Sequence, residues 1–149
     1  MSFIMSRFLS LLGFVVIASW LGNVADAKAA DDGPNPKEEI QKVIRQQLDA
    51  FRQNDFKTAY GFAHSGVKDQ FTQAEFERMV RGGFPTMLNP GEIVFGAMQE
   101  DGAKAAAQVL LRGENEETTA YQYLLEKEGG NWRITAVIPI ELETTDLQA

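Results

Sequence analysis

Residues 103–140 read AKAAAQVLLRGENEETTAYQYLLEKEGGNWRITAVIPI, and this stretch decides the fold class. Apolar and polar residues alternate along most of it, which indicates strands with one buried face. The interruptions GENE at 113–116 and EGGN at 128–131 are typical of hairpin loops. Because such short loops join antiparallel neighbours, the stretch predicts antiparallel strands at 103–112, 118–127 and 132–140.

A fourth strand precedes these three, since residues 92–98 also alternate and Glu100-Asp101-Gly102 follows them as a turn. Proline cannot donate to a strand ladder, so we expect Pro139 to end the last strand or to lie on a sheet edge. Positions of equal parity share a face, and the predicted apolar face holds Ala105, Ala107, Val109 and Leu111, then Tyr121, Tyr123 and Leu125, then Ile134, Ala136 and Ile138.

That apolar face must be covered, and its alanines leave space above the sheet. Two interpretations stay open. Either a helix packs closely on the alanines, or a cavity remains there, rimmed by Tyr121, Tyr123 and Trp132.

Three helices are predicted before the sheet, each with a start signal. Asn35 caps the first, Pro36 takes its first position, and apolar residues follow at helical spacing to Phe51 with one polar exception, Gln47. Asp55 caps the second, which we expect to end at Ser65-Gly66. Its packed side holds Phe56, Ala59, Tyr60 and Ala63.

The third helix opens with the capping box Thr72-Gln73-Ala74-Glu75, carries Phe76, Met79 and Val80, and stops at Gly82-Gly83. Residues 84–91 are expected to form a loop, because Pro85, Pro90 and Gly91 punctuate them. Helices first and a meander of strands second is the α+β pattern, here with N-terminal helices packed on a curved four-stranded antiparallel sheet.

The start of the chain resembles a secretory leader. Arg7 precedes a mostly apolar run at 8–21, and small-residue sites follow at 25–27 and 27–29. We therefore expect a signal peptide at 1–29, cleaved after Ala27 or Ala29, and a periplasmic or secreted protein. The alternative is a membrane anchor that is not cleaved. Residues 30–36 are then a tether, 37–142 a single domain, and 143–149 a flexible tail.

Composition excludes several classes of partner and site. The net charge is −7, which disfavours binding to nucleic acid or to an anionic membrane surface once the leader is removed. The absence of cysteine means that a hydrophobic core, and no disulfide, must stabilise an exported fold. One histidine and no cysteine do not make a usual zinc site, and neither a nucleophile motif nor a phosphate-binding loop occurs. Accordingly, we predict no catalytic residue, metal or cofactor.

Several segments, taken in order, resemble a known bacterial family. They are QLDAF at 47–51, Asp55, AYGFA at 59–63, Phe71, FERMV at 76–80, Phe84-Pro85, Pro90, Tyr121 and WRI at 132–134. The resemblance is to the domain of unknown function 4864 family, which is similar to the nuclear transport factor 2-like superfamily. It implies a cystatin-like cone in which a curved antiparallel sheet wraps the helices. The family has no established activity, so no catalytic residue is carried over.

Three functions remain open for this sequence. The first is a non-catalytic exported domain that binds a small apolar ligand or a protein partner, with Tyr60, His64, Tyr121, Tyr123 and Trp132 as candidate ligand-binding residues. The second is a small isomerase or hydratase with a pocket in the cone, because relatives in the superfamily include such enzymes. The third is a homodimeric assembly module of the cell envelope.

Overall fold

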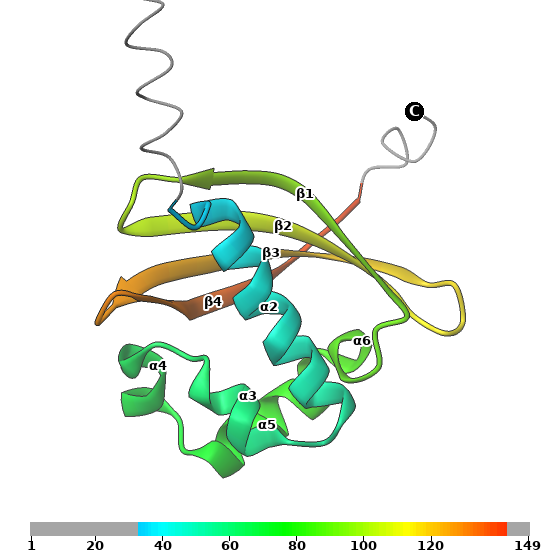
Figure 1. Cartoon of the computed structure of the whole chain (residues 1–149). Helices are drawn as coiled ribbons and strands as arrows, with labels where there is room; N and C mark the ends of the chain where they lie inside the picture. The colour runs from blue at the N-terminus through cyan, green and yellow to red at the C-terminus, as the bar shows by residue number, and fades with distance from the viewer. Residues whose placement is uncertain (1–32, 143–149) are drawn as a thin grey trace, which may run out of the picture. The chain divides into compact units, whose positions relative to one another are not determined.

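The computed structural model describes residues 33–142, in which helices come first and strands follow (Figure 1). The expected signal peptide and tail lie outside the described residues, as does most of the expected tether. The elements are α2 (Pro36–Arg52), α3 (Phe56–Gly61), α4 (Ser65–Gln70), α5 (Gln73–Gly83), α6 (Pro85–Leu88), β1 (Glu92–Glu100), β2 (Lys104–Arg112), β3 (Thr118–Glu128) and β4 (Asn131–Ile140). None of the helices within 33–142 is long and apolar enough to cross a membrane.

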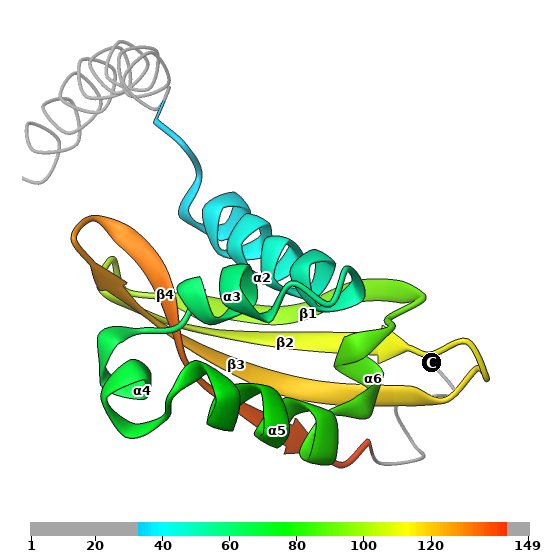
Figure 2. The same ribbon diagram turned by 90° about the horizontal axis from the view of Figure 1, so that it is seen from below.

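The sheet confirms the predicted antiparallel meander. Its order is β1-β2-β3-β4, and each strand pairs with the next through a short hairpin. Pro139 lies on β4, an edge strand, where its missing N–H costs no ladder bond on the open side. The labelled helices α2 to α6 lie in front of one face of the sheet in Figure 2, and α2 contacts both β1 and β4.

The predicted helix caps are confirmed. The side chain of Asn35 accepts a hydrogen bond from the Lys37 N–H, and that of Asp55 accepts one from the Thr58 N–H. At α5, Thr72 and Glu75 form the reciprocal capping box that the sequence predicts. These local signals place the starts of three helices without help from tertiary contacts.

The prediction for residues 62–70 was wrong. The second helix ends at Gly61, and Ser65-Gly66 begins α4, in which the His64 side chain accepts a hydrogen bond from the Gly66 N–H. The cause is a short parallel bridge to β4. The Ile134 N–H donates to the Phe62 carbonyl at 2.9 Å, and the His64 N–H donates to the Ile134 carbonyl at 2.9 Å. This pairing draws the chain out of the helix.

Residues 85–88, predicted as loop, form the one-turn helix α6. Pro85 stands in its first turn, where a missing N–H leaves no bond unmade. Met87 lies on this turn, and its side chain is buried in the hydrophobic core.

The predicted inner face is confirmed on β2 and β3, where its seven residues are all buried, and on β4 it is confirmed for Ile134 but wrong for the residues after it. Leu124 pairs with Ala136 but Leu125 pairs with Ile134, so Thr135 is an extra residue in a β-bulge. The bulge reverses the parity of the strand beyond it. Ile134 and Val137 consequently face the core, whereas Ile138 belongs to the outer face and is 49% exposed. Ala136 pairs with Leu124 and so leaves the predicted row, although it still borders the cavity described below.

Candidate functional site

A cavity of about 420 Å³ lies among α2, α4, α5, α6 and β4. Its buried lining residues are mostly apolar and include Phe51, Phe76, Val80, Met87 and Ile134. Other lining residues, such as Gln70 and the 38%-exposed Met79, reach solvent and mark the open side. The cavity therefore combines an apolar interior with access from outside.

The spacing of residues on α5 and the β-bulge of β4 determine which side chains line the cavity. Phe76, Met79 and Val80 come to one side of α5 because residues three and four apart share a helix face. The Phe76 ring stacks against Phe51 of α2, with ring centroids 5.9 Å apart. On the opposite side, β4 contributes the four residues 134–137 around its bulge. Secondary-structure elements from both halves of the described chain thus meet at the cavity.

Gln47 is the buried polar residue among the lining residues. It is 2% exposed, and its Nε2 donates to the Ala59 carbonyl at 3.3 Å. A carbonyl can only accept, so this bond sets the orientation of the amide. The Oε1 atom is buried and accepts no hydrogen bond within residues 33–142. An unpaired acceptor thus belongs to a residue that borders the cavity.

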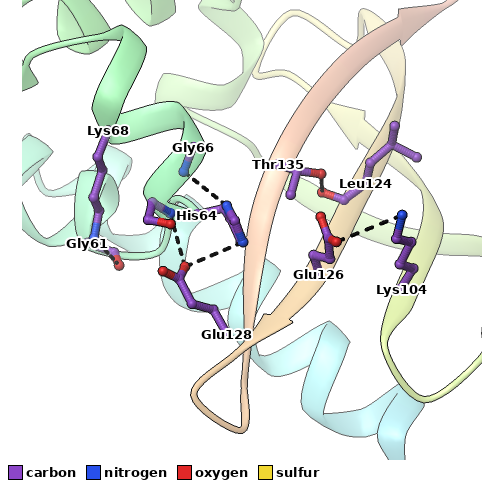
Figure 3. A network of polar contacts seen from close by, with 10 residues as sticks. Gly61, His64, Gly66, Lys68, Lys104, Leu124, Glu126, Glu128 and Thr135 are labelled. Carbon is purple, nitrogen blue, oxygen red and sulfur yellow. Dashed lines mark hydrogen bonds and ion pairs between the residues drawn. The ribbon is translucent and has the colours of Figure 1, made fainter.

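His64 also lines the cavity, and its ring lies between the Gly66 N–H and the Glu128 carboxylate (Figure 3). Its Nδ1 accepts a hydrogen bond from the Gly66 N–H at 3.0 Å, which requires the neutral ring to carry its proton on Nε2. That Nε2 lies 3.7 Å from Oε2 of Glu128. The same carboxylate oxygen accepts the Ser65 N–H at 3.0 Å, and this hydrogen bond is the main cause that lowers the pKa of Glu128.

The other predicted ligand-binding residues lie elsewhere in the core. Tyr60 donates its hydroxyl to the Phe71 carbonyl at 2.6 Å and so joins α3 to the segment before α5. Tyr121 and Tyr123 are buried on β3, and burial raises the pKa of both phenols. The Tyr123 hydroxyl lies 4.0 Å from the sulfur of Met87.

Trp132 is buried beneath the Lys127 ammonium, which lies 5.2 Å from the centre of its ring. Only His64, of the five predicted ligand-binding residues, lines the described cavity. The residues that sequence reasoning missed are Gln47 and the α5 side chains. Gln47 did leave a signal, as the polar exception on the apolar side of the first helix.

Charge and metal chemistry are limited at this site. None of the described residues that line the cavity is Asp, Glu, Lys or Arg. Across 33–142, no three His, Asp or Glu side chains gather as a metal site. The cavity therefore offers apolar contact and neutral hydrogen-bonding groups.

The comparisons with known proteins agree with the fold. The family model described as Domain of unknown function (DUF4864) matches residues 34–147. No curated protein matches the sequence significantly.

Among solved structures, the chain is similar to a SEC-C motif-containing protein from Rhodopseudomonas palustris. The TM-score is 0.52 at 14% identity, with 66% of this chain and 77% of the other covered. It is also similar to an NTF-2-like protein of unknown function from Shewanella oneidensis MR-1, with a TM-score of 0.49, 16% identity, and 72% and 100% covered. A candidate NTF2-like transpeptidase from Campylobacter jejuni gives a TM-score of 0.46 at 16% identity, with 68% and 99% covered.

Proposed function

The chain belongs to the DUF4864 family, whose function is unknown, and on that premise we propose that it binds a small, mostly apolar molecule in the cavity between α5 and β4. The sequence pattern at residues 1–29 predicts a leader and so supports export, and the proposed place of binding is the periplasm or the outside of the cell.

The cavity is the observation that carries this proposal. Protein interiors are normally filled to crystal-like density, and voids larger than a water molecule are few. An opening of about 420 Å³ with apolar walls falls in the size range of small-molecule sites. Contact with an apolar ligand would replace the dispersion interactions that Phe76, Val80 and Ile134 lack on their open side.

Fluorescence titration with the apolar dye 1-N-phenylnaphthylamine tests the proposal. Val67 of α4 lines the cavity and is half-buried, so Val67→Trp should fill the space, whereas Gln46→Trp on the exposed side of α2 is the control. We expect the wild type and Gln46→Trp to bind the dye alike and Val67→Trp to bind it at least about tenfold more weakly. Equal binding by all three proteins would place the dye elsewhere and contradict the proposal. Val67→Phe adds less volume and repeats the test if the tryptophan disturbs folding.

The isomerase or hydratase alternative has one candidate at the cavity, His64. General base catalysis needs a ring nitrogen with a free lone pair near the substrate. The Nδ1 lone pair of His64 accepts the Gly66 N–H, and Nε2 faces Glu128. In this arrangement His64 holds the start of α4 beside the cavity, which supports a binding role for the site.

A second candidate role is homodimerisation, and the outer face of the sheet favours it. Val94 and Ile138 are 46% and 49% exposed there. Strand register also places Val94, Leu110 and Ile140 in one apolar row across the sheet, with the buried Ala120 between Leu110 and Ile140. Sedimentation analysis of the wild type and of Ile138→Glu tests this role. We expect a dimer that the glutamate dissociates. A wild type that stays monomeric at high concentration would contradict it.

A further inference from the structure

Gln47 stands where a stable core would carry an aliphatic side chain. Its helix face holds Ile40, Ile44 and Phe51, and all of these are buried with it. The amide leaves Oε1 without a donor, and an unpaired buried acceptor is destabilising. A methionine of similar shape would avoid that loss. The position therefore calls for an explanation other than packing.

The hydrogen bond to Ala59 does not supply that explanation. The Ala59 carbonyl already accepts the Phe62 N–H at 3.2 Å, so Gln47 adds a second donor to an oxygen that has one. The other buried side-chain N or O atom without a partner in 33–142 is Nε1 of Trp132, and Trp132 does not line the cavity. Gln47 is thus the residue in 33–142 that both borders the cavity and carries an unpaired buried side-chain atom.

The remaining polar groups on the cavity wall are already used. Thr135 donates its hydroxyl to the Leu124 carbonyl at 3.1 Å (Figure 3). His64 accepts the Gly66 N–H at Nδ1 and turns Nε2 toward the Glu128 carboxylate 3.7 Å away, and Gln70 is exposed to water. No lining residue in the described chain is an acid, a lysine or an arginine. A charged ligand group would lose its hydration without a counter-ion, which disfavours ionised ligands.

We propose that Gln47 determines the specificity of the cavity by accepting a hydrogen bond from a neutral hydroxyl or N–H group on an otherwise apolar ligand. This inference rests on the proposed function, since it assumes that the cavity binds a small molecule. It adds the chemical class of that molecule. Hydrocarbons and ethers of the same size leave Oε1 unpaired and bind more weakly, because the site then retains a buried acceptor without a donor.

The test compares 2-naphthol with 2-methylnaphthalene, which exchange a hydroxyl for a methyl group at nearly constant size. Both are titrated by calorimetry into the wild type, Gln47→Met and Gln46→Met, each purified after expression of the whole chain. Gln46 is exposed on the same helix and serves as the matched control. We expect the wild type and Gln46→Met to prefer 2-naphthol by about tenfold. Gln47→Met should lose this preference and bind 2-methylnaphthalene at least as tightly as 2-naphthol, because the buried hydroxyl then has no acceptor.

The outcomes separate the two proposals. If both compounds bind the wild type equally, the role of Gln47 is overturned while ligand binding stands. A tenfold preference that persists in Gln47→Met also overturns it. If neither compound binds the wild type, the proposed function fails and this inference fails with it. The comparison within the wild type remains decisive even if Gln47→Met does not fold.

Discussion

Replacing Gln47 by methionine should stabilise the ligand-free protein. The change removes an unpaired buried carbonyl, which recovers about 1–3 kcal/mol of the free energy of unfolding. It also removes the hydrogen bond from Nε2 to the Ala59 carbonyl, and this loss lowers the free energy of unfolding by about 0.5–1.5 kcal/mol. The Ala59 carbonyl keeps its bond from Phe62, so no new unpaired group appears. Methionine and glutamine have similar helix propensities, and the net gain should be about 1 kcal/mol.

Urea unfolding followed by circular dichroism measures this gain. With a slope of about 2 kcal/mol per molar urea, the midpoint should rise by about 0.5 M and the slope should not change. Gln46→Met on the exposed side of α2 should shift the free energy of unfolding by less than about 0.5 kcal/mol. A Gln47→Met protein that is about 1 kcal/mol less stable than the wild type would refute the reasoning. That result would mean that the amide is fully satisfied in the folded protein.

Two further perturbations test the groups around the cavity. Glu128→Gln should lower stability near neutral pH, since the Ser65 N–H and His64 favour the ionised carboxylate and hold its pKa below the ordinary 4.5. A lowered folded-state pKa stabilises the fold above the unfolded value, and this contribution is lost as the pH falls through the folded value. The difference between Glu128→Gln and wild type in urea should therefore shrink between about pH 6 and about pH 3, and a constant difference would contradict the assignment. Tyr60→Phe removes the 2.6 Å hydrogen bond to the Phe71 carbonyl and should lower the free energy of unfolding by about 1 kcal/mol, measured the same way. An unchanged midpoint would show that the hydroxyl does not brace this segment.

Much of the fold could be predicted because its signals are local. The caps at Asn35, Asp55 and Thr72 each bind an N–H within three residues, so the sequence alone indicates them. The strands follow from alternation and from loops that suit hairpins. Both kinds of signal act over a few residues. They predict the same helix or strand whichever element packs on the apolar side.

The errors at the end of α3 and on β4 come from contacts that are distant in sequence. The exit from α3 depends on pairing between residues 62–64 and Ile134 on the far end of the chain. The bulge at Thr135 is defined by how β4 pairs with β3. The sequence of β4 alone does not indicate it, because its residues alternate without an interruption at that point. Misplacing that bulge assigns Ile138 to the wrong face.

The candidate site was only partly visible for the same reason. His64 was identified and does line the cavity, whereas the tyrosines and Trp132 were chosen for their place on the apolar sheet face. The cavity lies beside the edge strand instead, where α4 and α5 meet β4. Gln47 interrupts an apolar helix face in the sequence. Its unpaired oxygen emerges only when the Ala59 carbonyl and the cavity are located in space.

A crystal structure of the protein grown with 2-naphthol tests the central claim most directly. The account predicts the naphthalene ring between α5 and β4, in contact with Phe76, Val80 and Ile134, with its hydroxyl directed to Oε1 of Gln47. A ring bound only on the outer face of the sheet, or a cavity closed by its own side chains, would contradict it.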